Sequence, residues 1–311
     1  MRAVVYRSLG SPDVVEVADV DKPVPGLSEI RIKVQAATLN PTDAAAWSGG
    51  YFPAPPEGAA YGLGWEVAGV VDAVGPGIHW TPGQAVIAFS HGVPLGLNRG
   101  QAEYIVVPSQ AVAAAPAGVD PAHAATIPLN GLTAAQSVEL LGIQAGQTVL
   151  ITGAEGAVGG YAVQLAKRRG AVVIANDLSP DGEFATQVAG ADVYLPASQP
   201  LVEAVRKVRP EGVDAVLDTA MLGQAVIGAV ADGGRFVTTR IDALPQTERD
   251  IRVLLTQVGP DGAMLSTLSD LAAAGDLALR VAETYPLQDA SKAYAHMTRG
   301  GFQGRVVLTM E

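Results

Sequence analysis

The 311-residue chain contains no cysteine, which excludes disulfide bonds, thiolate nucleophiles and cysteine-ligated metals. Histidine is also rare, and the four present (His79, His91, His123 and His296) are scattered without the spacing of a metal site. We therefore predict that no metal is bound, and we expect each histidine to be a surface or loop residue.

Positive charge is scarce, because 20 lysines and arginines stand against 31 aspartates and glutamates, which gives a net charge of −11. An acidic surface repels phosphate backbones, so we expect no nucleic-acid partner. No apolar run approaches the length of a membrane span. Residues 1–6 lack the apolar core and cleavage site of a signal peptide. We therefore expect a cytoplasmic protein with no membrane partner.

The first part of the chain has the pattern of a strand-rich domain. Apolar residues make up 49% of the sequence, and its length predicts two domains instead of one small core. Short alternating or β-branched runs, separated by turns rich in Pro and Gly, lie at 30–34, 67–74, 85–89 and 102–107. Residues 40–43 resemble a turn that opens a short helix, because Asn precedes a proline and Asp favours helix starts.

The pattern changes near Pro121, where a helix-like region at 122–141 is interrupted near 128–131. Further on, strand patterns (193–195, 215–217, 235–239) alternate with helical ones (183–189, 200–208, 222–231), which is typical of a parallel doubly wound sheet. In the tail, two helices (263–274, 289–297) and a strand (304–310) are expected to return to the first domain. We predict one domain of residues 1–121 completed by 260–311, and a second domain of residues 122–259.

The stretch 148–177 has the order of a dinucleotide-binding unit: strand, glycine-rich turn, helix, strand, acid. A pyrophosphate approaches the N–H groups of a helix N-terminus only where no side chain blocks it. Gly156 is the candidate for that approach, and Gly159 for close packing of the helix on the strand. Ala154 occupies the first position of the usual G-x-G-x-x-G. Asp177 follows Gly159 by 18 residues, where a ribose-binding carboxylate is expected.

Short segments in a fixed order then resemble the medium-chain dehydrogenase/reductase superfamily, in its zinc-free quinone oxidoreductase (zeta-crystallin-like) branch. They are N-P-T-D at 40–43, S-G-G-Y at 48–51, G-W-E-V-A-G-V-V at 64–71, G-Q-A-E-Y at 100–104, I-P-L-N-G-L-T-A at 127–134, G-A-E-G-A-V-G at 153–159, Q-L-A-K at 164–167, D-G-G-R-F-V at 232–237, P-D-G-A at 260–263 and G-R-V-V-L at 304–308. Each is weak alone, and their shared order carries the resemblance.

The resemblance implies an α/β fold: a Rossmann doubly wound parallel sheet plus a β-rich GroES-like catalytic domain formed by the two chain ends. It also implies hydride transfer between NAD(P)H and a quinone or an α,β-unsaturated carbonyl, and a homodimer. The alternating run at 235–239 would suit a sheet-extending interface or the interior of a sheet. Loops at 49–62, 90–100 and 240–260 are expected to line the substrate pocket.

Three residues are implied near the reacting atoms. Asn40 would hold the nicotinamide or a substrate oxygen, or serve only as a turn residue. Tyr51 would donate a proton to a developing enolate, or stack on the substrate while solvent gives the proton. Thr133 would contact the nicotinamide side, or cap a helix. Trp47 stands where the family often has arginine, and Glu66 is expected to satisfy backbone groups or an arginine.

The remaining predicted cofactor contacts are Asn130 in the segment 127–134, Asp177, Thr219 and the residues of the glycine loop, Gly153, Ala154, Glu155, Gly156, Ala157, Val158 and Gly159. Thr219 belongs to a segment, 218–220, that follows a strand. Asp177 would accept hydrogen bonds from both ribose hydroxyls and repel a 2′-phosphate, which favours NADH, whereas the family resemblance favours NADPH.

Two other functions fit the same sequence. A nucleotide-binding sensor or structural member of the family would bind the cofactor and show little turnover. An alcohol or carbonyl dehydrogenase without metal would use the same fold. Nucleotide-dependent consumption of a panel of substrates distinguishes the three.

Overall fold

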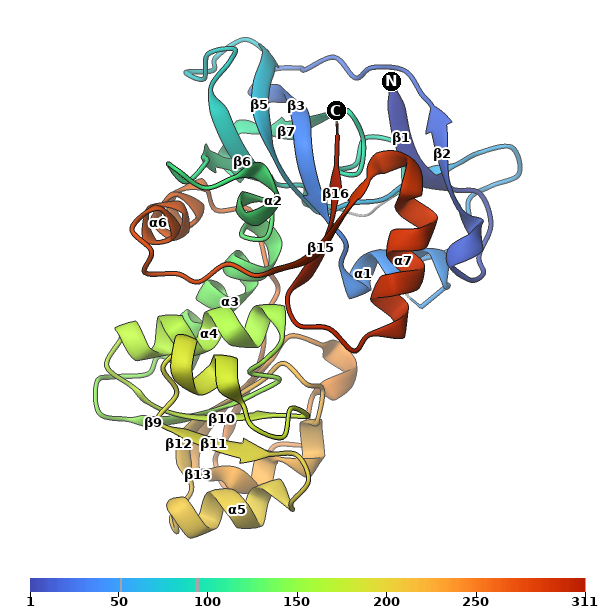
Figure 1. Ribbon diagram of the computed structural model, residues 1–311. Helices are drawn as coiled ribbons and strands as arrows, with labels where there is room; N and C mark the ends of the chain where they lie inside the picture. The colour runs from blue at the N-terminus through green and yellow to red at the C-terminus, as the bar shows by residue number, and fades with distance from the viewer. Residues whose placement is uncertain (51, 93–94, 311) are drawn as a thin grey trace. The chain divides into compact units, whose positions relative to one another are not determined.

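The computed structural model describes residues 1–50, 52–92 and 95–310, and it divides into two compact units (Figure 1). Unit 1 contains Met1–Leu129 and Gly259–Glu311, and unit 2 contains Asn130–Val258. The blue and red ends of the chain therefore belong to one unit, and the middle of the chain forms the other.

Unit 1 is built mainly from two β-sheets. The larger sheet has the order β15-β16-β3-β5-β6-β8, with β7 paired to β3, and the smaller has the order β2-β1-β4. The strands are β1 (Arg2–Tyr6), β2 (Val15–Asp19), β3 (Glu29–Thr38), β4 (Tyr61–Gly62), β5 (Glu66–Val74), β6 (Ala85–Phe89), β7 (Tyr104–Pro108), β8 (Val112–Ala114), β15 (Val281–Pro286) and β16 (Arg305–Thr309). Strand β16 pairs antiparallel with β3, so the C-terminal tail completes the N-terminal sheet as predicted.

The strand β3 shows why this part of the chain forms a sheet. Ile30, Ile32 and Val34 alternate with more exposed polar residues and are buried at 0–1% exposure. They pack with Val67 and Ile105 of the neighbouring strands in one apolar core. Burial of one face fixes the register, because a slip of one residue would turn that face to solvent.

Two helices of unit 1, α1 (Pro41–Trp47) and α7 (Ala290–Arg299), cover a second apolar core. The unit also contains α2 (Pro121–Ala124), α6 (Gly262–Ala273) and the 3₁₀ turns η1 (Pro12–Val14), η2 (Ser109–Ala111) and η7 (Leu287–Asp289). Trp47 of α1 meets Tyr294 of α7 edge to face, with ring centroids 5.9 Å apart. These rings join segments from both ends of the chain.

Unit 2 contains one fully parallel sheet of order β11-β10-β9-β12-β13-β14. Its strands are β9 (Thr148–Thr152), β10 (Val172–Asp177), β11 (Val193–Pro196), β12 (Val213–Asp218), β13 (Val230–Thr238) and β14 (Arg252–Leu255). The strand order reverses between β9 and β12, and ligands of such sheets bind at the carboxyl ends of the strands at that point.

The helical elements that connect these strands are α4 (Ala157–Arg168), α5 (Leu201–Val208), the π-helical turn η3 (Phe184–Val188), and the 3₁₀ turns η4 (Gly223–Ala225), η5 (Ile227–Ala229) and η6 (Ile241–Ala243). Helix α3 (Pro128–Leu141) begins at the last residues of unit 1 and continues in unit 2. Within the described ranges no helix combines the length and the apolar character that crossing a bilayer requires.

Two expectations from the sequence need correction, and one strand was not predicted. The predicted helix at 222–231 is two 3₁₀ turns followed by a strand. The Asp218 carboxylate holds the N–H groups of Leu222 and Gly223, and Gly223 adopts a φ of 51°. The predicted break near 128–131 lies earlier, because Pro128 starts α3 as the first helical residue. Strand β14 was not predicted. It pairs with β13, which makes the run at 235–239 interior to the sheet.

Candidate functional site

The glycine-rich loop of unit 2 forms a tight turn between β9 and α4. Gly153 has a φ of 66°, in the left-handed region that favours glycine, and Gly156 immediately precedes the helix. A Cβ on Gly159 would lie 2.0 Å from the Gly153 carbonyl oxygen, so only glycine lets the first helical turn pack on this loop. The role predicted for Gly159 in close packing agrees with this geometry.

Gly156 meets the requirement for a pyrophosphate approach. It is exposed. A Cβ added at Gly156 would come within 4 Å only of the Gly153 carbonyl group, whose oxygen would lie at 3.0 Å and whose carbon at 4.0 Å. Helix α4 starts at the next residue, Ala157, and its first turn presents N–H groups and the positive end of the helix dipole. The loop geometry therefore fits a dinucleotide, and the contacts of Gly156, Ala157 and Val158 with its phosphates stay predictions.

Asp177 ends β10 and is joined to the glycine loop. Its Oδ2 accepts a hydrogen bond from the Glu155 N–H at 2.9 Å, and its Oδ1 accepts one from the Leu178 N–H at 2.6 Å. The residue is only half-buried. A carboxylate offers about four lone-pair positions, so each oxygen keeps acceptor capacity for a ribose hydroxyl.

The surroundings of Asp177 are acidic. Glu155 is 8% exposed and its Oε1 accepts the Ala185 N–H at 2.8 Å. The Tyr194 hydroxyl donates to the Ser179 carbonyl oxygen at 2.5 Å. Burial raises the pKa of Tyr194 to about 12, and the negative charges of Asp177 and Glu155 add to this effect. Negative charge therefore gathers at this end of the glycine loop.

Thr219 lies at the carboxyl end of β12 beside the loop. Its hydroxyl donates to the Thr152 carbonyl oxygen at 2.6 Å, and the Thr152 hydroxyl donates to Asp218 Oδ1 at 2.7 Å. A Cβ on Gly153 would lie 2.6 Å from Thr219 Oγ1. These bonds fix the ends of β9 and β12 where the strand order reverses.

Helix α3 carries the two other predicted contacts of unit 2. Asn130 is 5% exposed and Thr133 is 8% exposed. The Ser137 hydroxyl donates to the Thr133 carbonyl oxygen at 2.6 Å and also lies 2.8 Å from the Thr256 hydroxyl. The predicted contacts of Asn130 and Thr133 with a cofactor stay predictions.

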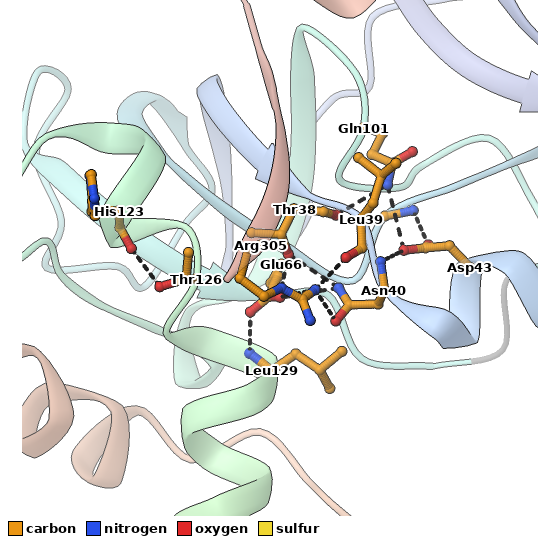
Figure 2. Close-up of polar contacts among 11 residues, drawn as sticks. Thr38, Leu39, Asn40, Asp43, Glu66, Gln101, His123, Thr126, Leu129 and Arg305 are labelled. Atoms are coloured by element: carbon orange, nitrogen blue, oxygen red, sulfur yellow. Dashed lines mark hydrogen bonds and ion pairs between the residues drawn. The ribbon is translucent and has the colours of Figure 1, made fainter. Parts of the chain in front are cut away.

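Unit 1 holds a buried polar cluster around Glu66 (Figure 2). Glu66 is 0% exposed; its Oε2 accepts the Leu129 N–H at 2.7 Å, and its Oε1 accepts the Asn40 amide at 3.1 Å and the Thr38 hydroxyl. Arg305 Nη2 lies 3.7 Å from the same Oε1. Burial raises the pKa of Glu66, and Arg305 and the three hydrogen-bond donors oppose that rise. Glu66 thus satisfies a backbone group and an arginine, as the sequence led us to expect.

Asn40 is held inside this cluster. Its side-chain oxygen accepts Arg305 Nη2 at 2.5 Å, and its amide nitrogen donates to Glu66 and, at 3.2 Å, to Thr38 Oγ1. Arg305 also donates to the Leu39 carbonyl oxygen. The Asn40 amide is thereby fixed in orientation, and its proposed contact with the nicotinamide stays a prediction.

Asp43 is a buried acid that holds the loop before β5. Its Oδ1 accepts the Gly64 N–H at 2.8 Å and its Oδ2 accepts the Asn40 N–H at 2.9 Å. Burial raises the pKa of Asp43 to about 7, against the effect of these hydrogen bonds and of Arg99. Nearby, the Gln101 amide donates to the Thr38 carbonyl oxygen at 3.1 Å and accepts the Tyr294 hydroxyl at 2.8 Å.

Sequence reasoning missed Arg305 and Gln101 as members of this cluster. Arg305 was visible as the one charged residue in the apolar closing run at 304–308, and such a residue signals a buried partner. Trp47 is 4% exposed and belongs to the apolar core. Tyr51, the predicted proton donor, lies outside the described residues. Among the residues that are described, no three His, Asp or Glu side chains gather as metal ligands.

Two family models match the chain. Residues 26–117 match the alcohol dehydrogenase GroES-like domain, and residues 189–308 match a domain described as zinc-binding dehydrogenase. A solved structure described as an NAD-dependent alcohol dehydrogenase shares 31% identity, covers 100% of both chains and superposes with a TM-score of 0.88. The chain belongs to the medium-chain dehydrogenase/reductase superfamily. Its fold is that superfamily's GroES-like domain with a Rossmann-type parallel sheet.

Two further relatives of this oxidoreductase chain have different names. It is 29% identical to the chloroplast envelope quinone oxidoreductase homolog of Arabidopsis thaliana, over 99% of this chain and 98% of the relative. It is 34% identical over 94% of its length to erythronolide synthase EryA2 of Saccharopolyspora erythraea, of which it spans only 8%. The superfamily is that of the NAD(P)-dependent dehydrogenases, and its members differ in substrate.

Proposed function

We propose that this chain is a zinc-independent NAD(P)H-dependent reductase that transfers hydride to a quinone or an α,β-unsaturated carbonyl. The bound nicotinamide supplies the hydride. The loop 153–159 holds the dinucleotide. The polar groups of unit 1 orient the acceptor, so that its reacting carbon lies close to the nicotinamide.

The observation that carries the proposal is the state of Glu66. Its carboxylate accepts hydrogen bonds from Thr38, Asn40 and Leu129 and lies beside Arg305, so it serves as an internal structural anion. The chain also has no cysteine to complete a Cys–His ligand set. A hydride acceptor that is already electron-poor, such as an enone or a quinone, suits a site with this donor set. The relative named as a quinone oxidoreductase homolog supports the same class.

The second candidate is an alcohol or carbonyl dehydrogenase. The observation that favours it is the NAD-dependent alcohol dehydrogenase structure, which matches over the whole chain. The two proposals differ in the acceptor: an aldehyde gains hydride at the carbonyl carbon, whereas an enone gains it at the β-carbon.

For the cofactor we propose NADH over NADPH. Asp177 and the buried Glu155 bring negative charge to the ribose end of the site, and a 2′-phosphate would be repelled there. We also propose that Tyr51 gives a proton to the enolate and that the chain forms a homodimer, which light scattering after size-exclusion chromatography would measure.

The test is steady-state consumption of NADH and NADPH with a small quinone, a small enone and an aldehyde of similar size. We expect kcat/KM to be highest for NADH with the quinone or the enone. An aldehyde turned over at least as well would favour the second candidate. Nucleotide binding without consumption of any acceptor would instead favour a sensor or structural role.

A further inference from the structure

Arg99 of unit 1 is a buried cation whose hydrogen-bonding groups are mostly unused. The residue is 5% exposed, and its guanidinium carbon lies 4.3 Å from the centroid of the Trp65 ring. Its Nη1 makes a long bond of 3.4 Å to the Gly92 carbonyl oxygen. Its Nε and Nη2 are buried and have no hydrogen-bond partner in the described part of the chain. This combination is uncommon, since buried charges are usually paired.

The nearest acid does not neutralise this group by a direct bond. Asp43 lies near enough to raise the pKa of Arg99, but its oxygens bond to the N–H groups of Asn40 and Gly64 and to the Gln101 amide. Burial lowers the pKa of Arg99 to about 10, which still leaves the side chain charged at neutral pH. A positive charge therefore remains inside unit 1.

The two unpaired nitrogens are the pair that suits a carboxylate. The Nε–H and one Nη2–H of a guanidinium point in parallel along one edge and meet both oxygens of one carboxylate. The Trp65 ring covers one face of the guanidinium plane, which limits its rotation. An ammonium group in the same place would offer charge without this fork.

The backbone around Arg99 is fixed before any ligand arrives. The Asn98 side chain donates to the Val106 carbonyl oxygen at 2.8 Å and accepts the Val106 N–H at 2.9 Å. The Gly100 N–H bonds to the Gly64 carbonyl oxygen at 3.1 Å. A Cβ on Gly62 would lie 3.1 Å from the Arg99 Cβ, so the backbone is tightly packed where the Arg99 side chain begins. Such preorganisation lowers the entropy lost on binding.

We propose that Arg99 is a specificity residue that binds a carboxylate on the substrate, which makes the preferred acceptor an anionic enone. This inference rests on the proposed reductase function. Arg99 belongs to the loop 90–100, which we expect to line the substrate pocket, and Trp65 directly precedes Glu66 in the chain. Both nitrogens are buried, so a carboxylate reaches them only when the atoms that cover them move.

The first test compares trans-4-oxopent-2-enoate with its neutral methyl ester as acceptors, with NADH in excess. We expect the wild-type kcat/KM to favour the anion over the ester by roughly 10–100-fold, the range of charge-assisted hydrogen bonds. Arg99→Gln should abolish this preference, whereas Arg99→Lys should keep a small part of it. Arg7→Gln, an equal loss of charge at an exposed ion pair with Glu16, should change neither.

A second test separates this inference from the reductase function. Calorimetric binding of unreactive 4-oxopentanoate needs no turnover, and we expect Arg99→Gln to weaken it at least tenfold while melting at the wild-type temperature. Turnover of the ester without an Arg99-dependent preference would overturn the Arg99 proposal alone. Failure of both enones and of a small quinone to oxidise NADH, with Arg99-dependent binding intact, would overturn the reductase function alone. Equal binding by wild type and Arg99→Gln, or no binding by wild type, would overturn the Arg99 proposal.

Discussion

Replacing Asp177 by serine should move the cofactor preference from NADH toward NADPH. The Asp177 carboxylate closes β10 and holds the Glu155 N–H of the glycine loop at 2.9 Å and the Leu178 N–H at 2.6 Å. It is half-buried, so its charge is only partly screened by solvent. Serine removes the charge and keeps a hydroxyl that suits either ribose.

The magnitude follows from the bonds involved. A hydrogen bond to a charged group contributes about 1.5–3 kcal/mol, and each 1.36 kcal/mol changes a rate by about tenfold. Loss of the ribose contact should therefore lower kcat/KM for NADH by roughly 10–100-fold. Relief of repulsion should raise kcat/KM for NADPH. The ratio of kcat/KM for NADH to kcat/KM for NADPH should therefore change by a larger factor than either kcat/KM does alone.

The assay is steady-state oxidation of each nucleotide with one quinone at saturation. Asp177→Asn, which keeps the size of the side chain and removes its charge, should shift the ratio in the same direction. Asp181→Ser is the matched control, because it removes an acid from the adjacent exposed loop, where it bonds to the Ser179 hydroxyl at 3.0 Å. An NADH-to-NADPH ratio that stays within twofold of wild type in Asp177→Ser would refute the reasoning.

Three further predictions concern packing and buried charge. Gly159→Ala should lower the free energy of unfolding by about 1–3 kcal/mol and weaken nucleotide binding, because its Cβ would meet a carbonyl oxygen at 2.0 Å. Gly96→Ala, which has open space, is the control, and equal melting temperatures would contradict this. The pKa of Asp43 is raised to about 7 from 3.8, so its stabilisation is complete below pH 4 and lost as the pH rises through 7. Urea unfolding should therefore show wild type losing stability relative to Asp43→Asn between pH 4 and 7.5, and a difference independent of pH would oppose this. Glu66→Gln should cost about 3–5 kcal/mol in the same measurement, since it leaves Arg305 buried without its anion, and a loss below 1 kcal/mol would disprove the role of this pair.

Much of the fold could be predicted because local patterns and tertiary packing agree. The alternation in β3, the β-branched runs of β9 and β10, and the helices α4, α5, α6 and α7 all lie where the sequence places them, within a few residues at their ends. Periodic burial of one face gives these segments a strong signal. The helix predicted at 222–231 does not form because the carboxylate of Asp218, at the end of β12, holds the N–H groups of Leu222 and Gly223 in tight turns.

The candidate site also has one part that local sequence patterns predict and another that depends on tertiary contacts. The sequence by itself determined the dinucleotide loop, because glycine spacing and the final acid are local requirements of a pyrophosphate and a ribose. It also determined that no cysteine chemistry takes place. Only the tertiary structure decided which side chains surround Glu66. Arg305 lies 239 residues after Glu66 in the sequence, and the pairing of β16 with β3 brings the two together. It likewise decided that Arg99 is buried on Trp65 with two N–H groups unpaired among the described residues, because burial and partners depend on contacts that no local pattern records.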